Sequence, residues 1–109
     1  MRKTVNITGL AKVIRSKNAG PFQITLDIMF KDRESYDLVK RQGLITRELI
    51  ARLYGLPLDR VLSVVYYDAA DSIKATIARA VSSGTVGDAD VYGAQQHAPL
   101  LDIEVPLNR

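Results

Sequence analysis

The sequence predicts an α+β protein, a two-layer α/β sandwich with a mixed sheet of about four strands and helices on one face. Alternating or β-branched apolar runs indicate the strands, and apolar residues at helical spacing between capping residues indicate the helices. The predicted order of elements is β-β-α-α-β-α-β. Because helix-containing crossovers are right-handed, those that follow the first hairpin should place the helices on one side of the sheet, as in the ferredoxin-like class.

The first predicted strands form an antiparallel hairpin. Residues 10–16 make the first strand, and residues 22–30 alternate in polarity along the second. One face of the second strand should carry Phe22, Ile24, Leu26, Ile28 and Phe30, and the other Gln23, Thr25, Asp27 and Met29. The short connection between them, residues 17–21, is typical of a tight hairpin turn.

Helix signals follow the hairpin. Asp32 is a suitable N-cap for a helix over 33–41 that ends at Gly43. Thr46 opens a second helix, which Gly55 closes.

The second half of the chain is predicted to contain strands and one more helix. Residues 61–67 form a nearly continuous apolar run, typical of an interior strand. Residues 68–83 are predicted to form a third helix, with an apolar stripe of Ile73, Thr76, Ile77, Ala80 and Val81. Residues 101–105 alternate again as a last strand, which Pro106 ends.

Length and composition indicate one domain over 1–109, with a lead-in at 1–9 and a long polar loop at 85–99. The net charge of +3 is small and its signs are interleaved, so we expect no nucleic-acid partner. No apolar run is long enough to cross a membrane and no export signal is evident, so we expect a cytoplasmic protein. With no cysteine and one histidine, we expect no metal site and no cofactor.

The hairpin connection is the main candidate for a binding site. Lys17 offers a charge, Asn18 offers amide donors and acceptors, and Gly20 permits positive φ. With Arg15 and Thr25, these residues are predicted to bind a carboxylate or phosphate. The alternative is a tight turn whose polar residues are merely solvated.

Three titratable residues stand apart from this cluster. Asp27 lies on the polar face of its strand, where it would face a ligand or simply solvent. His97 is the residue to which acid–base chemistry would look first, and its alternative is an exposed loop position. Asp68 follows an apolar strand, and we interpret it as the cap of the third helix.

Several runs of this sequence, at 14–22, 25–28, 53–55 and 64–68, carry a resemblance to a known family. They resemble the small domain of unknown function found beside, or fused to, proteins similar to the acyclic terpene utilisation protein AtuA. The resemblance implies a ferredoxin-like fold, an AtuA-like partner and a catabolic setting with organic acids or acyl thioesters. It implies no catalytic residues.

Three functions follow as hypotheses. The first is an accessory subunit or domain that docks on a larger AtuA-like protein, with residues 17–21 near a shared site. The second is a free-standing lyase or isomerase for an organic acid or acyl thioester, with Lys17 as anion clamp and His97 or Asp27 as base. The third is a homo-oligomeric module that binds a small anion.

Overall fold

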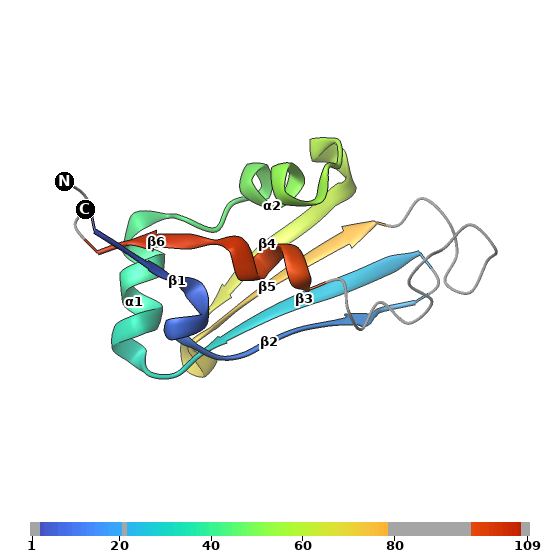
Figure 1. Cartoon of the computed structure of the whole chain (residues 1–109). Coiled ribbons are helices and arrows are strands. Elements are labelled where there is room, and N and C mark those ends of the chain that lie inside the picture. The colour runs from blue at the N-terminus through green and yellow to red at the C-terminus, as the bar shows by residue number, and fades with distance from the viewer. Residues whose placement is uncertain (1–2, 21, 79–96, 108–109) are drawn as a thin grey trace.

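The computed structural model describes residues 3–20, 22–78 and 97–107 and contains a four-stranded antiparallel sheet in the order β2-β3-β5-β4 (Figure 1). Its strands are β2 (Ala11–Asn18), β3 (Gln23–Phe30), β4 (Val61–Tyr67) and β5 (Ser72–Ala78). A separate antiparallel ribbon joins β1 (Thr4–Asn6) to β6 (Glu104–Pro106). The helices are α1 (Arg33–Gln42) and α2 (Arg47–Tyr54), with short 3₁₀ turns η1 (Ile7–Gly9), η2 (Leu58–Arg60), η3 (Asp68–Ala70) and η4 (Ala98–Asp102).

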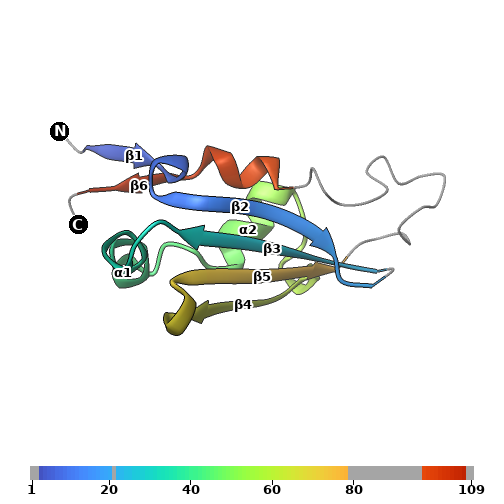
Figure 2. The same cartoon turned by 90° about the horizontal axis from the view of Figure 1, so that it is seen from below.

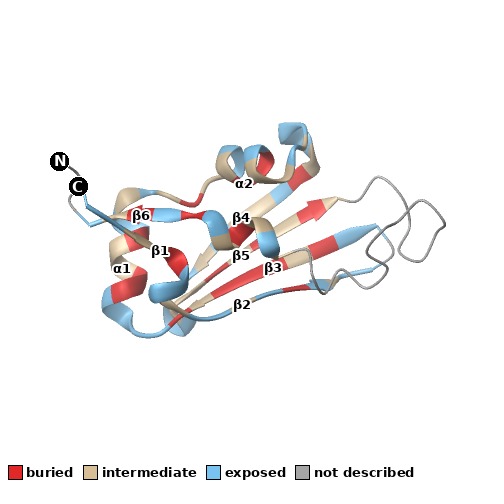
Figure 3. Cartoon of the chain, in the orientation of Figure 1, coloured by how far each residue is buried: buried red, intermediate tan, exposed pale blue. Residues whose placement is uncertain are grey.

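The second layer covers one face of the sheet. α2, the β1–β6 ribbon and η4 lie on this covered face, and α1 lies at one end of the sheet (Figure 1). Figure 2 views the sheet from the opposite side, with α2 behind it. Every second residue of β3 and β5 points into the core between the layers, as shown by the buried Ile24, Leu26, Ile28, Ile73 and Ile77 (Figure 3). The other face of the sheet, which we call the open face, carries the remaining side chains of these strands.

The predicted helix boundaries are confirmed by their caps. Asp32 accepts a hydrogen bond from the Ser35 backbone N–H at 2.8 Å, and α1 ends at Gly43 with φ 58°. Thr46 caps α2 in the same way, and α2 ends at Gly55 with φ 64°. None of the helices in the described part of the chain is long and apolar enough to cross a membrane.

The predicted third helix is wrong. Residues 68–71 form a 3₁₀ turn closed by Asp71 in the left-handed region (φ 50°), and residues 72–78 form strand β5. Ile73, Ala75 and Ile77 are buried in strict alternation, which fits a strand as well as Ile73 and Ile77 fit a helix. β5 lies between β3 and β4 and gains a strand partner on each side. Residues 79–83 of the predicted helix and 85–96 of the predicted loop lie outside the described residues.

This correction changes the sheet. Its strands pair antiparallel throughout, so the expected mixed sheet is wrong: β3 and β4 run parallel after their helical crossover, but β5 separates them. The order of elements does not follow the β-α-β-β-α-β alternation of ferredoxin-like proteins. The last strand begins at Glu104 and pairs in the β1–β6 ribbon, and the expected lead-in contains β1. Residues 61–67 form the outer strand β4, so the interior position expected for them is wrong.

Candidate functional site

The strand register lines up charged residues across the open face. Arg15 of β2 pairs with Asp27 of β3, and Asp27 pairs in turn with Lys74 of β5. Paired residues of neighbouring strands point to the same side of a sheet. A carboxylate therefore lies between two cations in the middle of the open face.

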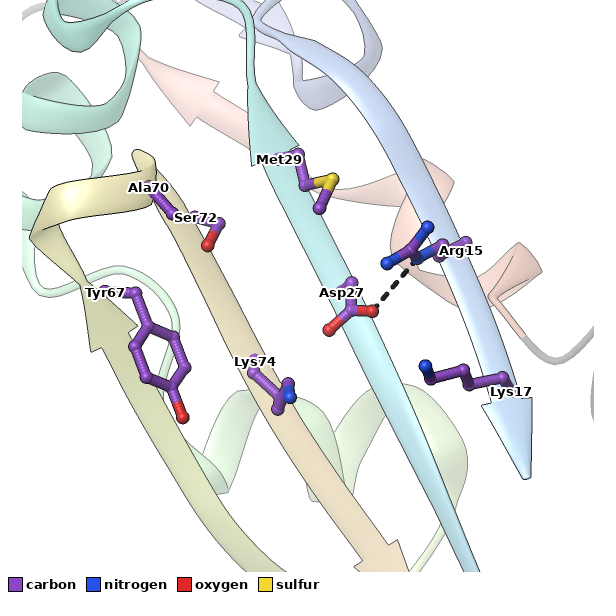
Figure 4. Close-up of a pocket in the computed structure, with 8 residues that line it drawn as sticks. All are labelled: Arg15, Lys17, Asp27, Met29, Tyr67, Ala70, Ser72 and Lys74. Carbon is purple, nitrogen blue, oxygen red and sulfur yellow. Dashed lines mark hydrogen bonds and ion pairs between the residues drawn. The ribbon is translucent and has the colours of Figure 1, made fainter. Parts of the chain in front are cut away.

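A shallow hollow of about 350 Å³ surrounds this row (Figure 4). It is lined by Arg15, Lys17, Asp27, Met29, Tyr67, Ala70, Ser72 and Lys74. All four strands of the main sheet or their turns contribute to it, and no single stretch of sequence contains it. We call it the basic hollow.

Among the described residues that line the basic hollow, Asp27 is the only carboxylate, and its neighbour Arg15 holds it. Arg15 Nε donates to Asp27 Oδ2 at 3.1 Å, and the Asp27 side chain is 9% exposed whereas that of Arg15 is 50% exposed. A buried carboxylate needs such a partner, because an unpaired buried charge is strongly disfavoured. Asp27 thus balances one of the cations, and the hollow keeps an excess of positive charge.

That excess comes from Lys17 and Lys74. Within the described residues neither ammonium group forms an ion pair. Lys74 Nζ lies 5.8 Å from the centre of the Tyr67 ring, so the aromatic face holds the ammonium without neutralising it. Figure 4 shows Lys17 and Lys74 reaching into the hollow on either side of Asp27. The arrangement can bind an anion by charge and by hydrogen bonds from the ammonium groups.

One rim of the hollow is fixed by α1. The turn between β4 and β5 contributes Ala70 to the lining, and Arg33 binds this turn through Asp68 O and Asp71 Oδ1, both at 2.6 Å. Tyr36 donates its hydroxyl to Asp68 Oδ1 at 2.6 Å, and Lys40 Nζ donates to the same oxygen at 2.7 Å. We call these contacts of the Asp68–Asp71 turn the rim clamp.

The electrostatics of the rim clamp follow from these contacts. The hydrogen bond from Lys40, and then that from Tyr36, holds the pKa of the Asp68 carboxyl below its usual range. Burial raises the pKa of the Tyr36 hydroxyl, and the hydrogen bond to Asp68 raises it further. Asp68 therefore does not cap a helix, as the sequence had suggested, but accepts hydrogen bonds from α1.

The predicted hairpin site is only partly brought together. Strand β2 continues to Asn18, so Lys17 and Asn18 are successive strand residues and point to opposite faces of the sheet. Lys17 joins Arg15 in the basic hollow, whereas Asn18 pairs with Ile24 in the register of the covered face. Gly20 has the positive φ expected of it (119°), and it lies in the turn outside the hollow.

Thr25 and Phe22 also differ from their predicted surroundings. Thr25 lies in the next row of the open face, beside Lys17, and its hydroxyl is 3.5 Å from the Lys17 carbonyl oxygen. It does not line the basic hollow. Phe22 precedes β3 and is 55% exposed, so it does not join the core as the alternation had predicted.

His97 and Asp27 are not brought together. His97 is the residue before η4, a turn whose Leu100 is fully buried in the core on the covered face. Asp27 points to the open face, where Arg15 holds it. The described residues contain no cluster of three or more acidic, histidine or cysteine side chains that could hold a metal ion.

Sequence reasoning missed Lys74, Tyr67 and Ser72, which line the same hollow as Arg15. The predicted third helix contains Lys74, and only the register of β5 with β3 puts Lys74 beside Asp27. The signal in the sequence that indicates Lys74 is the alternation of apolar and other residues over 73–78. It places Lys74 on the face of the strand opposite to the face of the buried Ile73 and Ala75.

A family model described as a domain of unknown function (DUF4387) matches residues 7–104. The chain belongs to this family. The match runs from η1 to the first residue of β6, so the DUF4387 domain includes the whole basic hollow and the rim clamp. No curated protein and no solved structure matches the chain.

Proposed function

We propose that this DUF4387 protein is an accessory subunit or domain that binds a carboxylate in its basic hollow and acts beside a larger AtuA-like catabolic protein. The observation that carries the proposal is the excess of positive charge that Lys17 and Lys74 give to the hollow. The AtuA-like partner rests on the sequence resemblance alone.

The chemistry of the hollow favours an organic acid. The lysine ammonium groups and the Arg15 guanidinium, which is half exposed, are donors suited to carboxylate oxygens. Met29, Ala70 and the Tyr67 ring add apolar surface next to these donors, which suits the carbon skeleton of an organic acid or of an acyl thioester. Such a site does not require a reaction within this chain, and it fits a domain that supplies part of a shared site.

Carboxylate binding is tested on the chain alone. Calorimetric titration with acetate and succinate should show binding that weakens as salt is added, because the contacts are electrostatic and exposed to solvent. We expect Lys17→Ala and Lys74→Ala each to weaken binding roughly fivefold, a loss of about 1 kcal/mol per charged contact. Lys31→Ala, which changes the net charge equally but lies outside the hollow, is the control. Equal affinities for all of these proteins would contradict the proposed site.

Partnership is tested separately, by co-expression with an AtuA-like protein and affinity purification through a tag on this chain. We expect the two proteins to copurify, and Lys17→Glu with Lys74→Glu to reduce ligand binding by the complex. If this chain stays alone while the large protein is folded, the accessory role fails, whatever the result of the carboxylate titration.

A further inference from the structure

The main sheet has two edges of different character. Within the described residues β2 and β4 are its outer strands, and the outward N–H and C=O groups of an outer strand can pair with another strand. β2 carries Lys12, Arg15 and Lys17, and charges of this kind oppose pairing between sheets. β4 has the sequence VLSVVYY, which contains no charged residue and no proline.

β4 also has the shape and surface of a strand that pairs. Residues 63–67 keep an unbroken register with β5. The irregularity of β4 lies at its start, between Val61 and Ser63, where the Val61 carbonyl accepts a hydrogen bond from Arg47 Nε at 2.9 Å, so the regular edge of β4 is residues 63–67. Leu62, Val65 and Tyr67 are 45%, 38% and 44% exposed. β4 forms one border of the sheet in Figure 2, on the side away from β2. A regular, uncharged edge with exposed apolar side chains is a surface that another strand would cover.

We infer that β4 pairs antiparallel with β4 of a second copy of this chain, which joins the two sheets into one. A two-fold axis through such a pair makes the interface self-complementary. Pairing of the regular edge, residues 63–67, is centred on Val65 and leaves Arg60 of each copy about two residues from Asp68 of the other. Asp68 keeps a side chain that is 59% exposed, so opposite charges lie near one another at both ends of the paired strands.

The alternatives for a second copy are less favourable. Pairing through β2 would gather Lys12, Arg15 and Lys17 of both copies along one joined edge, and like charges close together across a strand pair are destabilising. Stacking of the open faces would bring together the positive charge of two basic hollows. Pairing through β4 avoids both problems. Because its two-fold axis is perpendicular to the sheet, it leaves both hollows accessible on the same side of the joined sheet.

The inference goes beyond carboxylate binding and is tested on the purified chain. Sedimentation velocity over a range of micromolar concentrations should show a dimer. Val65→Lys should raise the concentration needed for dimerisation about tenfold or more, because it puts a charge from each copy into the joined edge. The control is Val13→Lys, since Val13 lies on the same face of the other outer strand and is 36% exposed, against 38% for Val65. This control should dimerise like the wild type. Because Val65 lies opposite Lys74 of its own chain, circular dichroism must first show that Val65→Lys is folded.

A second measurement does not depend on a destabilising charge. The chain has no cysteine, so single cysteines introduced at positions 62–66 report only on contacts between copies. After mild oxidation, a cysteine next to the two-fold axis should form an intermolecular disulfide, whereas Val13→Cys should not. A wild-type protein that is monomeric at every concentration overturns the inference, as does a dimer that Val65→Lys leaves intact or that only Val13→Cys crosslinks.

Discussion

Replacing Tyr36 with phenylalanine removes one hydroxyl from the rim clamp and leaves the packing of the ring in place. The ring is fully buried and packs edge-on against Phe30, with centroids 5.9 Å apart, and phenylalanine can repeat this contact. What is lost is the hydrogen bond to Asp68 at 2.6 Å. Hydrogen bonds to charged groups stabilise proteins by roughly 1.5–3 kcal/mol. Because Asp68 is partly exposed and keeps Lys40, we expect Tyr36→Phe to lose about 1–2 kcal/mol of unfolding free energy.

For a domain of this size that loss lowers the melting temperature by about 5–10 °C. Thermal unfolding followed by circular dichroism measures it. Tyr67→Phe is the control, since Tyr67 is 44% exposed and the loss of its hydroxyl should change stability by less than about 0.5 kcal/mol. Tyr36→Phe with the melting temperature of the wild type would refute the view that α1 fixes the rim of the hollow through this hydroxyl.

The same clamp predicts a dependence on pH. The pKa of Asp68 is lower in the folded state than in the unfolded state. Asp68 therefore contributes to the free energy of unfolding above its ordinary pKa of 3.8, and this contribution is lost as the pH falls through the folded-state pKa. The folded state raises the pKa of Tyr36, so that contribution is present below the ordinary value of 10.0 and is lost as the pH rises above it. The stability advantage of the wild type over Tyr36→Phe should therefore shrink in strong acid and in strong base. A constant difference across the whole range would contradict these assignments.

Other substitutions test the site and the frame that holds it. Asp27→Asn removes the carboxylate of the basic hollow and should raise carboxylate affinity roughly threefold to tenfold in calorimetry, whereas a role of Asp27 as an essential base or ligand predicts a loss. Gly43→Ala should destabilise the protein by about 1 kcal/mol in urea unfolding. The reason is the backbone, because φ at Gly43 is 58°, which alanine disfavours, while no atom lies within contact distance of an added Cβ. Unchanged stability would contradict this prediction. Thr46→Ala should lose about 1 kcal/mol with the cap on the Leu49 N–H, and Thr46→Ser should restore most of it.

Much of the fold could be predicted from patterns within short stretches of the sequence. The alternation of β3 and the caps of both helices are properties of neighbouring residues, and these elements are confirmed. Segment 72–78 failed because Ile73 and Ile77 satisfy a helical and a strand period equally, and the choice was made by pairing with β3 and β4. Such pairing between distant segments overrides local propensity and cannot be read within a short window.

The candidate site could be predicted from the sequence only in part. The prediction includes Arg15 and Lys17 as basic residues near the hairpin. It starts the turn at residue 17, whereas β2 continues to Asn18, and it therefore groups Lys17 with Asn18. If the strand is extended to residue 18, Lys17 and Asn18 point to opposite faces of the sheet. Lys74 could be found only after β5 was recognised as the neighbour of β3, because its closeness to Asp27 arises from sheet order.

Carboxylate binding in the basic hollow is tested most directly by following backbone amide signals in ¹H–¹⁵N NMR spectra while succinate is added. We expect saturable shifts at Arg15, Lys17, Asp27 and Lys74, with little change in the hairpin turn at Ala19 and Gly20, and a loss of these shifts in Lys17→Ala with Lys74→Ala. Shifts confined to the turn, or none at these four positions up to high succinate concentration, would contradict the account.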